Sequence, residues 1–275
     1  MIGQRYLQSR IHSMVRLGKL PRFIIFVGEF GSGRRTFTKW LADDLGAQFV
    51  EVGRGVDEVR EAIATSYKVS DKILYFFADA DNMSNASKHS LLKVTEEPPM
   101  NAYFVLSVSD TARLFDTIVS RASVFNMESY STSELAKFAG DDIKNIDVYT
   151  SCCNNGYEVE LVRGYGATDF LKFVNLVVDN IAEVSGCNAL KMETRIAFKP
   201  EDKGFDMKIF LQAFRAECMR HIMQSDDKSI REKFIAWIQV TSEKLQELTI
   251  QAINKQAVFD MWVFDIREAA MNAED

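Results

Sequence analysis

The sequence predicts an α/β domain built on a parallel sheet, followed by two all-helical segments. Over residues 1–127, short apolar runs alternate with stretches whose apolar residues recur at helical spacing, which is the pattern of parallel α/β units. Beyond Met127 the strand pattern fades and only helical spacing remains. We therefore expect three domains, at residues 1–127, 128–198 and 199–275.

Four strands are expected in the first domain, at residues 23–27, 49–52, 73–77 and 103–106. Most of them are continuous apolar runs, which is typical of strands buried on both faces. Helices are expected after the first three strands, at residues 37–45, 56–67 and 84–95. Pro98 and Pro99 end the last of these helices, because proline cannot continue a helix.

Helices alone are expected in the rest of the chain. Cap-type residues at 131–134 open one helix, and residues 169–184 carry an apolar face of a second. Residues 199–204 are polar and contain Pro and Gly, so they suit a linker. From Phe205 onward apolar residues recur at three- and four-residue steps, and the aromatic ones among them are expected to pack in a core or between subunits.

The composition excludes several classes of protein. The 275 residues are 47% hydrophobic, which excludes disorder as the main state. No run approaches the roughly 18 apolar residues of a membrane span and no signal peptide follows Met1, so we expect a cytoplasmic protein without membrane contact. The cysteines form no C-x-x-C pair, so buried thiols and no metal site are expected. The net charge of −6 argues against a surface that is basic throughout, but it allows a local basic patch.

A Gly-rich segment follows the first predicted strand and opens a predicted helix, where a phosphate-binding loop is expected. Its candidate residues are Gly28, Gly31, Ser32, Gly33, Arg34, Arg35 and Thr36. In the hydrolysing pattern G-x-x-x-x-G-K-[ST], a Lys contacts the phosphates and the next hydroxyl binds Mg²⁺. Arg34 and Arg35 hold those two positions, and Thr36 comes one residue late. We expect a relic or weak nucleotide pocket, and the alternative is a turn that binds nothing.

The end of the third predicted strand is altered in the same way. A hydrolysing site has an Asp for Mg²⁺ there, followed by a Glu that activates water. This chain has Ala78 at the metal position and Asp79 at the base position. We therefore expect no bound metal and no required cofactor, with ATP or ADP bound weakly or not at all.

Four strings, taken together, resemble one family. They are V-D-E-V-R-E at 56–61, A-D-N-M-S at 80–84, H-S-L-L-K-V-T-E-E-P-P at 89–99 and T-I-V-S-R-A at 117–122. Their order and spacing resemble those of the sliding-clamp loader subunits of the AAA+ superfamily. The resemblance implies a AAA+ nucleotide-binding domain, a small helical lid domain and an all-α collar domain that oligomerises. A broken phosphate loop beside an intact Ser-Arg is similar to the delta-prime class of DNA polymerase III subunits, which do not hydrolyse ATP.

The resemblance also implies roles for single residues. Arg121, which follows Ser120, would be an arginine finger that reaches into the ATP site of a neighbouring subunit; the alternative is an arginine that only caps a helix or forms a salt bridge with one. Ser109 falls at the polar sensor position of the pocket. In the lid, Val159 stands where the family carries a phosphate-sensing arginine.

Three basic residues are candidates for contacts with DNA or for coupling to it. Lys93 matches a basic residue that links the ATP sites of the family to DNA. Arg60 and Lys88 are candidates for contacts with DNA phosphates. The alternative for all three is a solvated lysine or arginine on a helix.

The function that the resemblance implies is that of a non-hydrolysing clamp loader subunit. Its partners would be ATPase subunits, a delta-like subunit, the sliding clamp and primer-template DNA. One alternative is an active loader ATPase that tolerates Arg34 and recruits Thr36 and Asp79 for Mg²⁺. Another is a AAA+-like structural adaptor outside replication.

Overall fold

The computed structural model describes residues 2–183, 192–199, 202–250 and 253–272. The chain divides into two compact units, Met1–Glu134 and Leu135–Asp275. Among the described residues, no helix is both long and apolar enough to cross a membrane.

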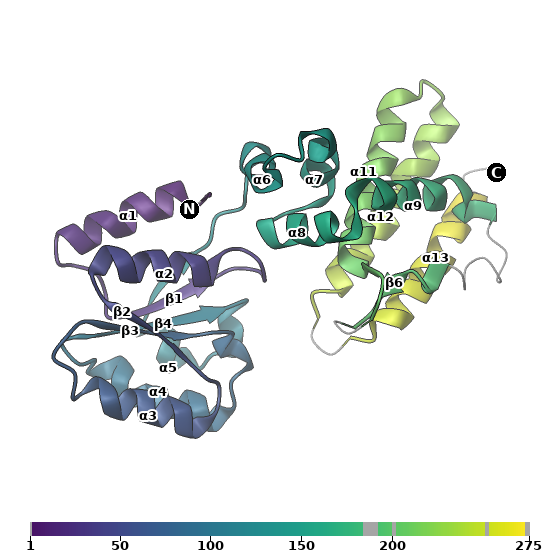
Figure 1. The fold of residues 1–275 in the computed structure, drawn as a ribbon. Coiled ribbons are helices and arrows are strands. Elements are labelled where there is room, and N and C mark those ends of the chain that lie inside the picture. The colour runs from purple at the N-terminus through teal and green to yellow at the C-terminus, as the bar shows by residue number, and fades with distance from the viewer. Residues whose placement is uncertain (1, 184–191, 200–201, 251–252, 273–275) are drawn as a thin grey trace. The chain divides into compact units, whose positions relative to one another are not determined.

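A five-stranded sheet forms the centre of the first unit (Figure 1). Its strands are β1 (Phe23–Val27), β2 (Gln48–Val52), β3 (Ile73–Phe77), β4 (Ala102–Val108) and β5 (Ser123–Asn126). Their order across the sheet is β2-β3-β4-β1-β5, and every neighbouring pair is parallel. The carboxyl ends of all these strands therefore meet at one edge of the sheet, and their amino ends meet at the opposite edge.

The helices of the first unit cover both faces of this sheet. They are α1 (Arg5–Arg16), α2 (Arg34–Leu45), α3 (Val56–Ser66), α4 (Asn85–Glu96) and α5 (Asp116–Val119), with short turns η1 (Ala80–Asn82) and η2 (Thr111–Arg113). Buried residues of α1 and α2 pack in one core cluster, and those of α3, α4 and α5 pack in another.

Successive residues of a central strand enter different clusters. In β3, Tyr75 belongs to the cluster under α3 and α4, while Leu74 and Phe76 belong to the cluster under α1 and α2. Each central strand is therefore apolar on both sides, which explains the continuous apolar runs of the sequence. The predicted α/β fold with a parallel sheet is confirmed.

One strand of the first unit was not predicted. β5 lies at the edge of the sheet and has four residues, of which Val124 is exposed and Phe125 is buried. A short edge strand covered on one face lacks the continuous apolar run that reveals the central strands.

The second unit is mainly helical. Its helices are α6 (Thr132–Ala139, which begins at the boundary between the units), α7 (Ile146–Cys152), α8 (Gly156–Tyr165), α9 (Ala167–Asn180), α11 (Met207–Gln224), α12 (Lys228–Glu247) and α13 (Lys255–Asn272). Aromatic rings fill the core between α11, α12 and α13, as expected; the rings of Phe214 and Trp262 lie 4.9 Å apart. Trp262 Nε1 also donates a hydrogen bond to Thr241 Oγ1 at 3.0 Å.

Two short strands flank the stretch expected as a linker. β6 (Ile196–Ala197) and β7 (Phe205–Asp206) pair with each other, and the ring of Phe205 packs against Phe170 and Phe173 of α9. Pro200 and Glu201 lie outside the described residues, as does Val184 at the end of the helix expected over 169–184. The division into lid and collar domains stays a prediction.

The cysteines that the structure describes, Cys152, Cys153 and Cys218, are buried free thiols, as expected. Burial raises the pKa of the Cys218 thiol well above its usual range. Cys187 lies outside the described residues.

Candidate functional site

The Gly-rich loop lies at the carboxyl edge of the sheet, between β1 and α2. Gly31 and Gly33 have φ angles of 86° and 88°, which glycine adopts without strain. The predicted strand-loop-helix context is thus present, with α2 beginning at Arg34. The Ser32 hydroxyl lies close against Gly28. A Cβ atom added at Gly28 would lie only 2.6 Å from Ser32 Oγ.

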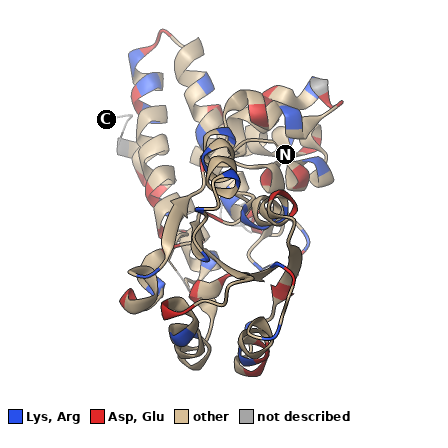
Figure 2. Cartoon of the chain, turned by 90° about the vertical axis from the view of Figure 1, so that its left-hand side faces the viewer, with Lys and Arg blue, Asp and Glu red and all other residues tan. Residues whose placement is uncertain are grey.

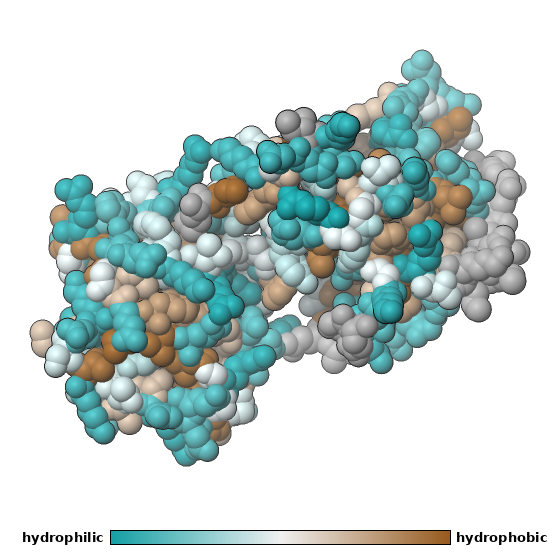
Figure 3. Space-filling view, viewed as in Figure 1, coloured by the Kyte–Doolittle hydropathy of each residue, from teal (hydrophilic) through white to brown (hydrophobic). Residues whose placement is uncertain are grey.

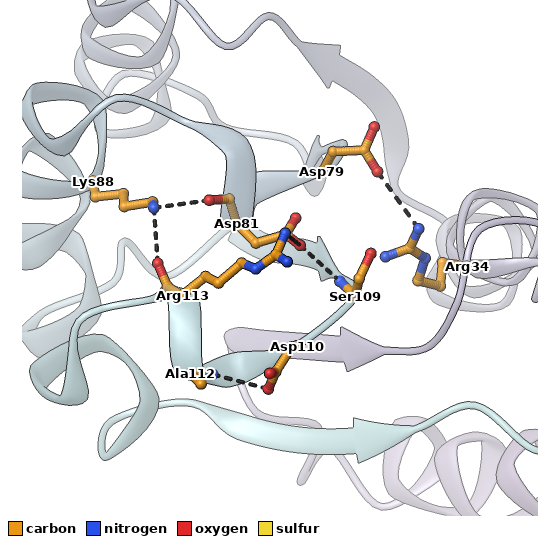
Figure 4. A network of polar contacts seen from close by, with 8 residues as sticks. All are labelled: Arg34, Asp79, Asp81, Lys88, Ser109, Asp110, Ala112 and Arg113. Carbon is orange, nitrogen blue, oxygen red and sulfur yellow. Dashed lines mark hydrogen bonds and ion pairs between the residues drawn. The ribbon is translucent and has the colours of Figure 1, made fainter. Parts of the chain in front are cut away.

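Arg34 is buried, with 6% of its surface exposed. Its Nη2 lies 3.5 Å from Asp79 Oδ1, so the residue at the lysine position of the loop faces the carboxylate at the base position (Figure 4). Burial lowers the pKa of Arg34, while Asp79 and Asp81 raise it. The guanidinium stays charged at neutral pH, because the ordinary pKa of arginine lies far above it.

Arg35 and Thr36 both lie on the exposed side of the first turn of α2. Arg35 is exposed and forms an ion pair with Glu51 of β2. Thr36 is exposed on the first turn of α2. Among the residues that the structure describes, no three His, Cys, Asp or Glu side chains gather in a way that would hold a metal ion. At the two positions where a hydrolysing site has a hydroxyl and a carboxylate for Mg²⁺, this chain has Arg35 and Ala78.

A second cluster of polar contacts ties the end of β3 to the end of β4 (Figure 4). Asp81 is buried, and its Oδ2 accepts a hydrogen bond from the Ser109 backbone N–H at 3.1 Å. Arg113 Nη1 lies 4.0 Å from the same oxygen. Asp81 and Arg113 were not predicted as site residues, although Asp81 belongs to the A-D-N-M-S string that carried the resemblance.

Lys88 is part of this cluster, and its predicted contact with DNA is wrong. Its Nζ donates hydrogen bonds to the backbone oxygens of Asp81 at 2.9 Å and Arg113 at 2.8 Å. Only 6% of Lys88 is exposed, so its ammonium group does not reach a surface on which DNA could lie. Lys88 instead fastens η1 to η2.

Tyr130 closes over the loop from the segment after β5. Its hydroxyl donates a hydrogen bond to the backbone oxygen of Ser32 at 3.1 Å. A Cβ atom at Gly33 would lie 2.7 Å from this hydroxyl, and one at Gly3 would lie 2.4 Å from the ring. Burial raises the pKa of Tyr130. Sequence patterns missed this residue, because its distance from the loop along the chain hides the contact.

Arg121 lies at the opposite edge of the sheet. It precedes β5 by two residues, and Ser123 pairs with Ile24 near the start of β1. Arg121 Nη1 donates a hydrogen bond to the Thr117 backbone oxygen at 3.0 Å, and Ser120 Oγ donates to the same oxygen at 3.3 Å. Arg121 Nη2 lies 3.1 Å from Glu96 Oε1 at the end of α4.

The structure thus divides the predicted site residues into two groups. The loop residues, Asp79 and Ser109 lie at the carboxyl edge, while Ser120 and Arg121 lie near the amino edge. Arg60 on α3 and Lys93 on α4 are exposed and belong to neither group. Val159 is fully buried in α8 of the second unit.

Known proteins resemble this chain at the level of sequence. Residues 54–131 match a family described as DNA polymerase III, delta subunit. The DNA polymerase III subunit gamma of Buchnera aphidicola from Acyrthosiphon pisum is 24% identical over 237 residues, covering 74% of this chain and 64% of that protein. Replication factor C small subunit 1 of Pyrobaculum aerophilum is 24% identical over 204 residues, covering 67% of this chain and 61% of that protein. The chain thus spans less than two thirds of these relatives.

A solved structure is also similar to this chain. It is a DNA polymerase III gamma subunit-related protein from Thermotoga maritima, with 15% sequence identity and a TM-score of 0.49. The match covers 94% of this chain and 99% of that one.

Proposed function

Because the chain belongs to the AAA+ clamp-loader family of DNA replication proteins, we propose that it is a non-hydrolysing loader subunit of the delta-prime type. It assembles with ATPase subunits and a delta-like subunit, supplies Arg121 to a neighbour's ATP site and helps place a sliding clamp on primer-template DNA.

The separation of Arg121 from the chain's own loop carries this proposal. The loop follows the carboxyl end of β1, and Arg121 lies beside its amino end. A strand of five residues spans roughly 16 Å at about 3.3 Å per residue. An arginine side chain is shorter than that, so Arg121 does not reach the chain's own loop. A catalytic role for Arg121 therefore requires the nucleotide of another subunit.

The pocket at the carboxyl edge supports the non-hydrolysing part of the proposal. A hydrolysing loop needs a hydroxyl and a carboxylate that hold Mg²⁺ against the phosphates. Here Arg34 places a fixed cation beside Asp79, and Tyr130 covers the backbone at Ser32 and Gly33. The pocket holds ATP or ADP weakly or not at all, and the chain needs no cofactor of its own.

Apolar side chains on the surface of the second unit support assembly with other subunits (Figure 3). Those on α12 and α13 that are at least two-fifths exposed are Ile230, Ile235, Met261, Phe264 and Met271. Side chains of this kind bury apolar area when helices of neighbouring subunits pack together, and that burial stabilises a complex. We assign the collar role to these helices.

The charge distribution fits a subunit that meets DNA only as a member of a complex. Figure 2 shows segments of Lys and Arg interspersed with segments of Asp and Glu along the helices. The exposed side chains of Arg60 and Lys93 remain candidates for phosphate contacts. A few local cations suffice when neighbouring subunits supply most of the phosphate attraction.

Reconstitution with the loader ATPase subunits and clamp of the same organism tests the proposal. The chain should co-purify with both, and Arg121→Ala should leave assembly intact but lower the DNA-stimulated ATPase rate at least tenfold, since trans fingers contribute about 10³ to 10⁵ in rate. Arg16→Ala, which removes an exposed arginine from the end of α1, serves as the control. Equal rates for both variants would contradict the finger role, and failure to co-purify would favour an adaptor outside replication.

A further inference from the structure

Arg121 is held by two contacts from its own unit. Nη1 donates to the Thr117 backbone oxygen at 3.0 Å, and Nη2 lies 3.1 Å from the carboxylate of Glu96. A guanidinium has five N–H donors, so these contacts leave others for an incoming anion. The side chains of Arg121 and Glu96 are 40% and 59% exposed, so a neighbouring subunit can reach both.

The backbone that carries this pair is firmly anchored. Ile118 of α5 is fully buried in the same core cluster as Leu91 and Val94 of α4. The rings of His89 in α4 and Phe115, the residue before α5, also meet, with 4.6 Å between their centroids. The end of α4 and the residues after α5 therefore keep a fixed spacing.

The residues that follow α4 are held by hydrogen bonds as well. Tyr67 donates its hydroxyl to the Glu97 backbone oxygen at 3.3 Å, and Arg22 Nη1 donates to the Pro99 backbone oxygen at 2.7 Å. Glu96 is thus presented from a rigid position. Arg121, by contrast, has a long side chain that loses much rotamer freedom when it is ordered.

We propose that Glu96 is a positioning residue for Arg121: it holds the guanidinium in one orientation near the amino edge of the sheet before a neighbour's phosphate groups arrive. This inference rests on the proposed role of Arg121 as a finger in trans. Ordering the side chain in advance lowers the entropy that must be lost when the transition state forms. Because the ion pair is exposed, its effect is modest, and the carboxylate can yield to a phosphate.

Glu97 offers a matched control. It is the adjacent glutamate and is also exposed, but the carboxylate within ion-pair distance of Arg121 belongs to Glu96. Glu96→Gln and Glu97→Gln therefore change the net charge equally and at nearly the same place. Lys93, one helical turn before Glu96 on α4, is present in both variants.

The experiment uses the reconstituted loader and measures kcat and KM for ATP with Glu96→Gln, Glu97→Gln and Arg121→Ala. Glu96→Gln should lower kcat about two- to fivefold, as expected for an exposed ion pair, and should leave KM unchanged. Rising salt should shrink the ratio of wild-type to Glu96→Gln rates, because it screens the pair. Glu97→Gln should match the wild type. A structural defect would instead lower the melting temperature of the isolated chain, so this is measured for each variant.

Two further variants separate positioning from stability. Glu96→Asp should restore part of the rate. The exchange of both residues, Glu96→Arg with Arg121→Glu, keeps an ion pair but removes the finger, so it should fold and yet be as slow as Arg121→Ala.

The possible failures are distinguishable. If Arg121→Ala leaves kcat unchanged, the finger proposal fails and this inference fails with it. If Arg121→Ala is slow while Glu96→Gln equals Glu97→Gln, only the positioning role is overturned. A faster Glu96→Gln would also overturn it, since Glu96 would then restrain the finger.

Discussion

The Arg34 guanidinium lies 3.5 Å from the Asp79 carboxylate. Arg34 occupies the loop position at which a hydrolysing enzyme has a lysine, and Asp79 occupies the position of its general base. The side chain that would contact a phosphate thus pairs with the group that would activate water. The Arg34 side chain is 6% exposed and that of Asp79 is 35% exposed, and a buried charged group such as Arg34 needs a partner of opposite sign.

Restoring the loop pattern should therefore alter nucleotide binding more than hydrolysis. The wild-type chain should bind fluorescent ATP weakly and without dependence on Mg²⁺. Arg34→Lys combined with Arg35→Thr should introduce Mg²⁺-dependent binding, which fluorescence anisotropy would detect. Hydrolysis should stay at background in both proteins, because Ala78 still replaces the metal carboxylate. Mg²⁺-dependent turnover by the wild type would support the alternative of an active ATPase.

Tyr130 should stabilise the closed loop. Tyr130→Phe removes the hydroxyl that binds the Ser32 backbone oxygen, so it should lower the free energy of unfolding by about 0.5–1.5 kcal/mol. Tyr130→Ala should further expose the loop and strengthen ATP binding. Tyr6→Phe, at a tyrosine that is 72% exposed, is the control and should change stability by less than about 0.5 kcal/mol. Urea denaturation measures the free energy of unfolding of Tyr130→Phe and of Tyr6→Phe. Equal losses in these two variants would refute the role of the Tyr130 hydroxyl.

Lys88 should matter for folding and not for DNA. Lys88→Met leaves the backbone oxygens of Asp81 and Arg113 without their donor, which should cost about 2–3 kcal/mol of unfolding free energy. Lys68→Met, at an exposed lysine after α3, should cost less than about 0.5 kcal/mol. In the assembled loader, Lys88→Met should not alter the salt dependence of DNA binding. If DNA binding by the Lys88→Met loader depended less on salt than binding by the wild type, a contact between Lys88 and DNA phosphates would be supported instead.

Tyr149 should make stability depend on pH in the alkaline range. Burial, assisted by the hydrogen bond from Tyr149 to Asp142 Oδ2 at 2.5 Å, raises the pKa of Tyr149 to about 12. The folded state thus holds this proton more tightly than the unfolded state, in which the pKa is about 10. The stabilising contribution is complete below about pH 10 and is lost as the pH rises through 12.

Tyr149→Phe should flatten this dependence. Denaturation series between pH 8 and 12 would compare the variant with the wild type and with Tyr6→Phe. An unchanged alkaline slope in Tyr149→Phe would show that another group titrates there.

Local sequence patterns predicted helix starts and the buried central strands of the sheet. Ser84 caps α4 by accepting the Ser87 backbone N–H at 3.1 Å, as the predicted helix start required. The strands at 23–27 and 73–77 were predicted with their observed bounds. Lys88, however, looks like any other lysine on a helix, and only the packing of η1 and η2 around it shows that it is buried.

The sequence by itself determined the α/β class, the strand-loop-helix context of Gly28–Thr36, the residues by which that loop departs from the hydrolysing pattern and the motifs of the loader family. Only the tertiary structure decided that β5 pairs beside β1, that Arg121 and the loop lie at opposite edges of the sheet, and that Tyr130 and Glu96 contact Ser32 and Arg121. The physical reason is the range of the forces involved. Periodicity, caps and glycine conformations act between residues close in the chain, whereas strand order and side-chain partners depend on contacts between residues far apart in it.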